Sequence, residues 1–581
     1  MKNKKIITFG LSTLAVGILS FGISSCFFNS KVTDKFGKEY QRESIHYYYN
    51  NENATSANEY VNVTAYFKDN EDICYVDVKT MALYLGDLYG LPFDVVCEGD
   101  SVKVSYDSFS GKEYLTINSK TNEVTVSSPN FYQYIGVNEN VTSSKEFEIT
   151  KEKYEIKPIT YTLSDYSLEA NVIDNKITLP LQVFNLIFCN SASYNFYYIN
   201  HAIYGDVCNQ NFSGISTSSP TSAQRELTYN FFKLFLGQYY GLSSYLGLNT
   251  VSEIETFLSP YKDNLLSTTT ATFEQAELDI LYKALNDPHT SLYADSLGNS
   301  FYSIYHNSFS DVKPTYGTRM LKIKDALEEY TTKQKFSLST SSYTPITFGK
   351  NSFFSRQSNT YGVIVDDTAY IFLKEFNLTE EKSESNIDSD TFSLMYYSLQ
   401  FIDLYQKVNN KTIKNIVVDL TQNLGGVVVA GLELLSFMTN DPITWNYDFG
   451  NRNIFSSTSI KVDNNLDGNF NDNDAYTQYN WYIETSLCSF SCANLVPMIA
   501  KENGYAKIIG QTSGGGMCVV GSVTLPDGLR FNTSSISTRN ITKAEKNNTT
   551  NFELNENGVT PDITLSPSLF YSYNFINYYL D

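Results

Sequence analysis

The run Ser489-Phe490-Ser491-Cys492-Ala493-Asn494 lies between two glycine-rich stretches, and the three together decide the fold of the C-terminal half. The upstream stretch is Asp419-Leu420-Thr421-Gln422-Asn423-Leu424-Gly425-Gly426, and the downstream stretch is Ile508-Ile509-Gly510-Gln511-Thr512-Ser513-Gly514-Gly515-Gly516. Apolar residues precede the first glycine pair, and helical patterns follow both it and Ser491. This arrangement predicts sharp strand-to-helix turns, one of which carries the Ser491 hydroxyl among backbone N–H groups.

Outward from these turns, strands and helices alternate along the chain. The apolar pattern predicts strands at 362–365, 369–373, 413–419 and 506–510, and helices at 427–438 and 495–502. Short apolar strands separated by helices are typical of a mostly parallel sheet that is buried on both faces. We therefore predict an α/β domain over residues 360–570.

The stretch before this domain has helical periodicity over residues 220–300. Bulky apolar residues recur at helical spacing near 227–235, and a second helix is expected at 273–285. Because proline ends a helix, Asn286-Asp287-Pro288 places His289 on the loop just beyond it. The polar stretch 300–358 is expected to hold one charged helix, near 320–332.

The N-terminal third is rich in Tyr, Val and Thr, and predicts a strand-rich α+β module over residues 59–212. Two of its segments, 74–85 and 177–188, are alike: each predicts a short strand followed by an amphipathic helix. The pattern resembles the small N-terminal-like module of copper amine oxidases, which implies a spacer or binding role and no metal chemistry. The polar residues 27–58 predict a tether.

The first residues are typical of a targeting segment. Lysines 2, 4 and 5 precede an apolar stretch over 6–23, and Ile23-Ser24-Ser25-Cys26 follows. Small residues before a cysteine resemble a bacterial lipobox, in which the cysteine is lipidated. We predict a signal peptide over 1–26, with Cys26 lipidated and the protein anchored on the extracellular face of the membrane. A plain secretory signal and an uncleaved anchor are the alternatives.

Charge and cysteine content exclude some classes of partner. The net charge is −21, and a nucleic-acid surface needs clustered Lys and Arg, so no nucleic acid is expected. The chain has eight cysteines and no CxxC motif, which disfavours a zinc knuckle. Cys488, Cys492 and Cys518 are interpreted as small apolar packing residues, with a disulfide or a redox-sensitive site as the alternative.

Four motifs in order resemble the C-terminal-processing (tail-specific) serine peptidases. They are the stretch 419–426, the Ser491 turn, the stretch 504–516 and the run 556–563, Glu-Asn-Gly-Val-Thr-Pro-Asp-Ile. The resemblance covers residues 220–570 without 300–358, and no peptide-binding PDZ module is recognisable at 291–358. It implies a protease core of the ClpP/crotonase-like type with a helical N-terminal subdomain, peptide or protein substrates, and no required cofactor.

The same resemblance assigns roles to individual residues. Many family members pair the serine with a lysine, but Gly514-Gly515-Gly516 offers no amine where that lysine is expected. The tricorn-like branch uses a histidine and a glutamate instead. This implies Ser491 as nucleophile, His289 as general base and Glu556 as the group that orients the system, directly or through a polar neighbour.

The oxyanion donors implied by this reading are the Cys492 N–H and that of Gly425 or Gly426. Structural alternatives exist for each side chain: Ser491 as a helix N-cap, His289 as an ordinary loop residue and Glu556 as an exposed turn residue. At the level of the whole protein, the alternatives are a catalytically inactive surface lipoprotein whose cleft binds peptide or another ligand, and an adhesive role for the N-terminal module.

One signal is independent of the family. Residues 463–474 read Asp-Asn-Asn-Leu-Asp-Gly-Asn-Phe-Asn-Asp-Asn-Asp, which fits the spacing of a calcium loop with glycine at position six. The last position is Asp rather than the longer Glu, and flanking helices are doubtful. We predict a possible structural calcium, with a hydrophilic turn as the alternative. The candidate ligands are Asp463, Asn465, Asp467, Asn469, Asn471 and Asp474.

Overall fold

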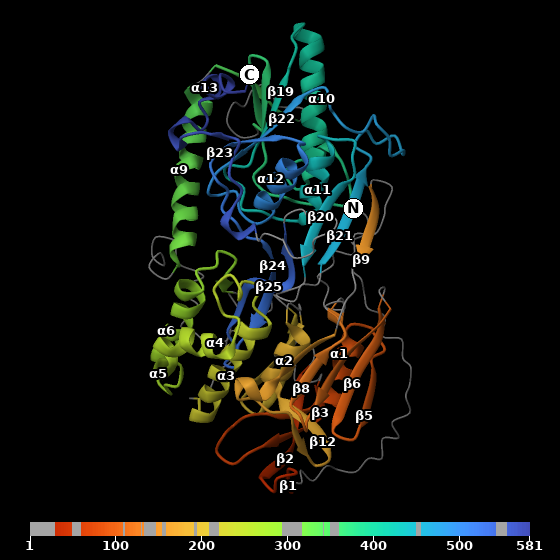
Figure 1. The fold of residues 1–581 in the computed structure, drawn as a ribbon, viewed down its shortest axis with the longest axis vertical. Helices are drawn as coiled ribbons and strands as arrows, with labels where there is room; N and C mark the ends of the chain where they lie inside the picture. Colours follow the sequence, from red (N-terminus) through yellow and green to blue (C-terminus); the bar gives the residue numbers. More distant parts are fainter. Residues whose placement is uncertain are drawn as a thin grey trace.

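The computed structural model describes residues 30–48, 60–108, 111–128, 131–132, 147–153, 158–190, 194–207, 220–292, 316–340, 342–348, 360–448, 455–541 and 555–580. The predicted signal peptide, with Cys26, lies outside the described residues. No helix in the described ranges is long and apolar enough to cross a membrane. Figure 1 shows an elongated molecule, with the α/β domain at one end and the N-terminal module at the other.

The α/β domain is built on a seven-stranded sheet, ordered β16-β17-β18-β19-β22-β23-β26. Strands β18 to β26 along this order run parallel, and β16 and β17 are antiparallel additions at one edge. The mostly parallel sheet predicted from sequence is therefore confirmed. The strands are β16 (Thr344–Ile346), β17 (Gly362–Val365), β18 (Thr368–Phe372), β19 (Asn415–Asp419), β22 (Asn480–Thr485), β23 (Lys507–Gly510) and β26 (Ile563–Thr564).

Both faces of this sheet are covered, which explains its continuous apolar strands. In β19, Ile416 and Val418 pack into one core, and Val417 between them packs into another. Helices α10 (Thr391–Asn409), α11 (Val428–Ser436) and α12 (Cys492–Asn503) contribute to the first core. Helices α9 (Thr318–Thr340) and α13 (Tyr573–Asn577) contribute to the second (Figure 1). A strand buried on both faces has no polar side, so no alternation is visible in its sequence.

A second, antiparallel sheet lies beside the first and connects distant parts of the chain. Its order is β15-β25-β20-β21-β9, with β24 also paired to β25. The two-residue strand β15 pairs Ser291 with Asn532 of β25, so the loop that carries His289 is held against the hairpin β24–β25. The strands are β9 (Phe147–Lys153), β15 (Ser291–Leu292), β20 (Ile443–Asp448), β21 (Phe455–Val462), β24 (Cys518–Thr524) and β25 (Arg530–Asn540).

The helical subdomain forms where the sequence predicts it. Helix α3 (Ser222–Gln238) begins with a capping box between Thr221 and Gln224. It packs with α4 (Val251–Leu258), α5 (Lys262–Leu265) and α6 (Thr270–Leu278), and a π-helical turn over Asp279–Ala284 continues α6. Leu285 follows the turn and Pro288 stands three residues further on, so the chain leaves the helix just before His289.

The N-terminal module contains two sheets, ordered β11-β12-β4-β3-β2-β14-β13 with β1 beside β2, and β10-β8-β7-β6-β5. The two similar segments are confirmed: β4 (Tyr75–Asp77) leads into α1 (Val78–Leu88), and β12 (Lys176–Pro180) leads into α2 (Leu181–Cys189). Strands β4 and β12 pair antiparallel, so the two copies meet. The other strands are β3 (Tyr60–Phe67), β5 (Asp94–Glu98), β6 (Ser101–Ser108), β7 (Gly111–Asn118), β8 (Glu123–Val126), β10 (Ile159–Thr162), β11 (Asn171–Ile173), β13 (Tyr194–Ile199) and β14 (Ala202–Val207).

The predicted tether over 27–58 is wrong for residues 30–48. Strands β1 (Ser30–Thr33) and β2 (Glu39–Tyr48) belong to the larger sheet, and β2 pairs with β3 along eight residues. Ile45 and Tyr47 are buried in the module's core, while their neighbours are at least partly exposed. A half-buried strand carries polar residues at every second position, so its composition resembles that of a polar tether. Strand β9, which lies inside the predicted module range 59–212, pairs instead with β21 of the second sheet.

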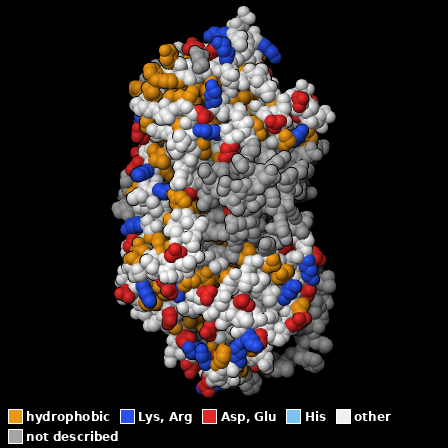
Figure 2. Space-filling model, viewed as in Figure 1, with side chains coloured by type: hydrophobic (Ala, Val, Ile, Leu, Met, Phe, Trp, Pro, Cys, Tyr) orange, Lys and Arg blue, Asp and Glu red, His pale blue; other side chains and the backbone are white. Residues whose placement is uncertain are grey.

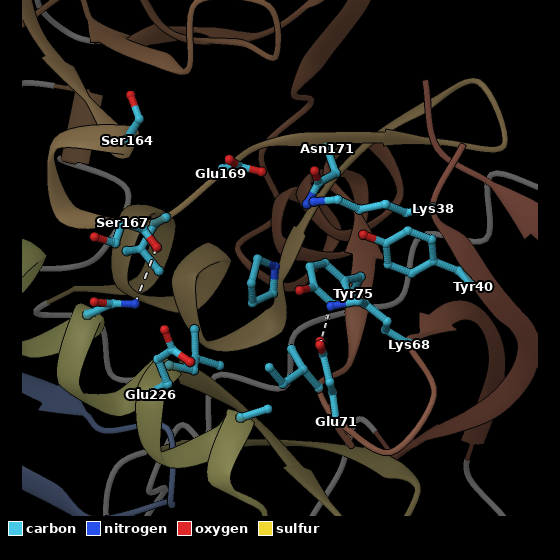
Figure 3. Close-up of a pocket in the computed structure, with 16 residues that line it drawn as sticks. Lys38, Tyr40, Lys68, Glu71, Tyr75, Ser164, Ser167, Glu169, Asn171 and Glu226 are labelled. Carbon is cyan, nitrogen blue, oxygen red and sulfur yellow. Dashed lines mark hydrogen bonds and ion pairs between the residues drawn. The ribbon is translucent and has the colours of Figure 1, made fainter. Parts of the chain in front are cut away.

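A cavity of about 340 Å³ lies where the N-terminal module meets α3. Figure 3 shows polar side chains around it, among them Lys38, Tyr40, Glu169 and Glu226. None of Ser491, His289 and Glu556 lines this cavity, so it is separate from the site described next. On the surface, Figure 2 shows acidic and basic side chains intermixed on the face in view.

Candidate active site

Ser491 lies on a strained turn between β22 and α12. Its backbone has φ 57° and ψ −120°, a conformation that a residue with a Cβ rarely adopts. The Ser491 N–H donates to the Gly515 carbonyl at 2.9 Å, which ties the turn to the downstream glycines. The side chain makes no capping hydrogen bond to α12, so the N-cap alternative is not what the structure shows. The turn presents a partly exposed hydroxyl that is not engaged with the helix.

Glycines are required on both sides of this turn because other groups approach it closely. A Cβ added at Gly425 would lie 2.7 Å from the Ser491 Cβ, and one at Gly516 would lie 2.9 Å from the Ser491 nitrogen. Both residues also have positive φ, 112° and 87°. The two glycine-rich motifs therefore meet at the serine, as the sequence predicts.

The loop that holds Gly425 is rigid and orients its N–H groups. The Gly425 N–H donates to Asn423 Oδ1 at 2.7 Å, and Asn423 Nδ2 donates to the Leu373 carbonyl at 3.0 Å. The loop pairs with Phe376 through the Gly425 carbonyl and the Val427 N–H, neither of which uses the Gly426 N–H. The Cβ position at Gly425 lies 3.1 Å from the Cys492 nitrogen at the start of α12. Of the two glycine N–H groups predicted as donors, that of Gly425 is already used within its own loop.

His289 packs against the residue that precedes the serine. The ring centroids of His289 and Phe490 are 4.6 Å apart, and the histidine is 8% exposed. Its Nδ1 forms a 2.9 Å hydrogen bond with Ser534 Oγ of β25. Among the residues that the structure describes, none hydrogen-bonds the buried Nε2 of His289, so the Ser491 hydroxyl is not bonded to it. His289 thus packs against the residue next to Ser491 in the chain, with Nδ1 oriented by Ser534 and Nε2 uncommitted.

Asp287 holds the histidine loop and the β25 strand together. Its Oδ1 accepts the His289 N–H at 2.9 Å, and its Oδ2 accepts the Ser534 N–H at 3.0 Å. Burial lowers the pKa of His289; the Asp287 carboxylate acts in the opposite direction and the Arg319 guanidinium in the same direction. The net shift is downward, so the imidazole is neutral at neutral pH, the state that a general base requires.

Glu556 is buried beside the same glycines, which excludes its alternative as an exposed turn residue. It is 1% exposed, and its Oε2 accepts the N–H groups of Gly516 at 3.2 Å and Met517 at 3.0 Å. Its Oε1 lies 2.5 Å from Arg319 Nη1 in an ion pair. Burial raises the pKa of Glu556 despite the opposing Arg319 charge. Glu556 thus braces the loop that contacts Ser491, whereas the hydrogen bond at His289 Nδ1 is made by Ser534.

Sequence reasoning missed three contributors to this site. Asp287 stands in the same Asp-Pro-His run as His289, and its position two residues before the histidine was the one available signal. Arg319 near the start of α9 and Ser534 in β25 carry no such signal. Each is an ordinary residue type within an ordinary element, and only the pairing of distant elements brings it to the site.

The three cysteines near the site are buried, as the packing interpretation predicts. Burial raises the pKa of Cys488 to about 12, so that thiol is not ionised at neutral pH. A Cβ on Gly431 of α11 would approach the Cys492 sulfur to 2.6 Å. These thiols fill space beneath the turn.

Comparison with known proteins places this site in a family. Residues 367–565 match the model of peptidase family S41. This match covers the predicted α/β domain, so the predicted resemblance to this peptidase family and the α/β fold class are confirmed, whereas the tricorn-like branch and the lipoprotein signal stay predictions. Comparison with curated proteins gave no match.

Among solved structures, similar ones include a putative peptidase from Parabacteroides merdae, with 14% identity, a TM-score of 0.38, and coverage of 60% of this chain and 90% of that one. The photosystem II D1 C-terminal processing protease has 15% identity and a TM-score of 0.32, with coverage of 60% and 94%. Mature CPAF has 14% identity and a TM-score of 0.38, with coverage of 62% and 95%.

Proposed function

We propose that this protein is a serine endopeptidase that hydrolyses exposed or extended peptide through an acyl-enzyme, with Ser491 as nucleophile and His289 as general base. The observation that carries the proposal is the Ser491 hydroxyl on its strained turn beside the buried imidazole with an uncommitted Nε2. The match to peptidase family S41 supports the reaction class. Hydrogen bonds between catalytic groups are often long before substrate binds. We therefore expect the Ser491–His289 hydrogen bond to form in the substrate complex.

In the proposed first step, Ser491 Oγ attacks the carbonyl carbon of the scissile bond and its proton passes to His289 Nε2. The imidazolium then gives this proton to the leaving amine as the C–N bond breaks, which leaves an acyl-enzyme. In the second step a water molecule attacks the acyl carbon and gives a proton to His289. The bond between the acyl carbon and Ser491 Oγ then breaks, the carboxylic acid product leaves, and His289 returns the proton to Ser491 Oγ.

Ser534 and Asp287 are proposed as positioning residues for the base. If His289 Nδ1 carries the hydrogen and donates it to Ser534 Oγ, Nε2 keeps its lone pair and is the nitrogen that can accept a proton. Asp287 fixes the two backbone N–H groups that hold this geometry. The role assigned to Glu556 is indirect: it orders the Gly516–Met517 backbone against the turn and balances the Arg319 charge.

The negative oxygen of the tetrahedral intermediate needs preorganised donors. We assign this role to the N–H groups of Cys492 and Gly426. Cys492 stands in the first turn of α12, where N–H groups lack helical partners and the helix dipole favours negative charge. Gly425 then contributes through its lack of a side chain, because any side chain there would occupy the space beside Ser491.

We also propose that the enzyme works outside the cytoplasm, attached to the membrane through a lipid on Cys26. The support is the sequence alone: lysines, an apolar stretch and small residues before the cysteine. Mass spectrometry of the N-terminal peptide from membrane fractions tests this proposal. A diacylated Cys26 at the mature N-terminus is expected, and a soluble Cys26→Ala form is the matching control; an unprocessed N-terminus in the wild type would contradict the anchor.

Covalent labelling with a fluorophosphonate probe tests the catalytic proposal. We expect the wild type to be labelled at Ser491 and Ser491→Ala to remain unlabelled. Ser489→Ala is a matched control, since Ser489 is fully buried and its hydroxyl donates to the Leu420 carbonyl at 2.7 Å. Its labelling should persist even if its stability falls. A folded wild type that neither reacts with the probe nor cleaves peptide would favour the inactive, ligand-binding lipoprotein instead.

A further inference from the structure

In the loop between β21 and β22, side-chain oxygens accept hydrogen bonds from backbone N–H groups of the same loop. Asp463 Oδ2 accepts the Gly468 N–H at 2.7 Å, and the Asp467 N–H points at both Asp463 Oδ1 and Asn465 Oδ1 at 3.1 and 2.9 Å. Gly468 has φ 85°, which lets the chain reverse at position six. These hydrogen bonds bring the side-chain oxygens of positions one and three together at the backbone N–H of position five.

Two carboxylates of this loop are buried without a balancing cation. Asp463 is 3% exposed and Asp474 is 6% exposed. Asp474 Oδ2 accepts the Asn471 N–H at 2.7 Å, but its Oδ1 is buried and has no hydrogen-bond partner. Within the described ranges, no Lys or Arg forms an ion pair with either residue. A buried carboxylate oxygen with no partner is costly, so it indicates a missing positive group.

The charges within the loop also repel one another. Asp463, Asp467 and Asp474 bring three carboxyl groups into this one loop. A divalent cation would cancel this repulsion and would give the Asp474 oxygen a partner. Carboxylate, amide and main-chain oxygens are the ligands that calcium prefers.

We propose that residues 463–474 form a calcium site that stabilises the peptidase half. Asp463, Asn465, Asp467 and Asp474 supply side-chain oxygens, Asn469 supplies its carbonyl, and Asn471 acts at position nine, directly or through water. In the part of the chain that the structure describes, no three His, Cys, Asp or Glu side chains are gathered so as to hold a metal alone. The amide and main-chain oxygens are therefore essential to this site.

The loop is also attached to the helix that follows the oxyanion glycines. Asn464 Oδ1 accepts the hydroxyl hydrogen bond of Ser436 at 3.0 Å, and the Tyr476 N–H donates to the Phe437 carbonyl at 2.9 Å. Ser436 ends α11, whose first residue stands two positions after Gly426. A bound cation would fix the far end of α11, so its effect is on stability rather than on the chemical step, and it does not depend on the proposed peptidase activity.

Titration calorimetry and thermal unfolding of the whole chain test this site with calcium chloride, with magnesium chloride in parallel. We expect one calcium ion per chain and a rise in melting temperature at millimolar calcium. Asp463→Asn and Asp474→Asn should weaken calcium binding by about tenfold or more, because they remove ligand charge. Asp472→Asn is the matched control, since Asp472 is exposed in the same loop at a position that supplies no ligand.

If the buried variants fail to fold, Asp467→Asn carries the test, because Asp467 is exposed. Binding that is unchanged in Asp467→Asn or Asp474→Asn would overturn the site. A well-folded wild type that shows neither binding heat nor a shift in melting temperature would overturn it as well.

Discussion

The two halves of the candidate site are assembled in different ways. The nucleophile half, Ser491 with the Gly425 and Gly516 loops, is built from consecutive turns of one parallel sheet. The base half combines the end of the helical subdomain at His289, the start of α9 at Arg319 and strand β25 at Ser534. The first half depends on short connections, and the second depends on the docking of separate elements.

This difference has a physical consequence. In the nucleophile half, backbone conformation decides the geometry, and glycine is the residue that permits it. In the base half, side-chain hydrogen bonds and charges decide both the orientation and the pKa of the imidazole. Substitutions in the two halves should therefore reduce activity in different ways. In the nucleophile half they should do so through steric clashes, and in the base half through changes in charge and hydrogen bonding.

The largest effect is expected from removal of the base. His289→Ala should lower kcat/KM for a peptide substrate on the order of 10⁴-fold or more, because the serine then lacks a proton acceptor. Steady-state cleavage and the rate of fluorophosphonate labelling both measure this loss. His201→Ala is the control, since His201 lies in the N-terminal module, hydrogen-bonded to Glu43 and Tyr198. Equal activity of His289→Ala and wild type would remove His289 from the mechanism.

A smaller loss of activity is expected when a side chain is added beside Ser491 in the nucleophile half. Gly425→Ala places a methyl group 2.7 Å from the Ser491 Cβ and 3.1 Å from the Cys492 nitrogen, so it should disturb both the serine and a proposed oxyanion donor. We expect kcat to fall by about 10²- to 10³-fold, the cost of one lost donor. Gly504→Ala is the matched control: Gly504 has φ 74° with open space around it, so it should cost roughly 1–2 kcal/mol of stability and leave kcat unchanged. Equal kcat values for the two variants would show that the space at Gly425 is irrelevant.

The smallest effect is a shift in pH dependence from the base half. The pKa of His289 lies below its ordinary value of about 6.5, so kcat/KM should stay high as pH falls through that value and decline only at lower pH. Asp287 raises this pKa, so Asp287→Asn should lower it further and move the acidic limb to still lower pH. A pH profile of kcat/KM measures the shift. An acidic limb that moves to higher pH in Asp287→Asn would mean that the limb belongs to another group.

Much of the fold can be predicted from the sequence, and the wrong predictions have a common cause. Four strands and two helices after residue 360, the helical subdomain and the duplicated strand-helix segment follow from apolar periodicity and proline placement, whereas α10, β22 and the strands of the second sheet were not predicted. The tether over 27–58 was mistaken because β2 is only half buried, and β9 was assigned to the wrong unit because its partner β21 is distant in sequence. Periodicity reports burial along one segment and contains no information about which segment covers it.

The sequence by itself determined the turn chemistry of this protein: glycines at the positive-φ positions, a serine between strand and helix, a proline that frees His289 from its helix, and the spacing of the loop 463–474. Tertiary structure alone decided that Ser534 hydrogen-bonds the His289 imidazole and that Glu556 contacts the Gly516 backbone. It also decided that the charges of Asp287 and Arg319 shift the pKa of His289 in opposite directions. Backbone conformation is a local property of a few residues, whereas burial and electrostatic coupling exist only after distant elements have packed together.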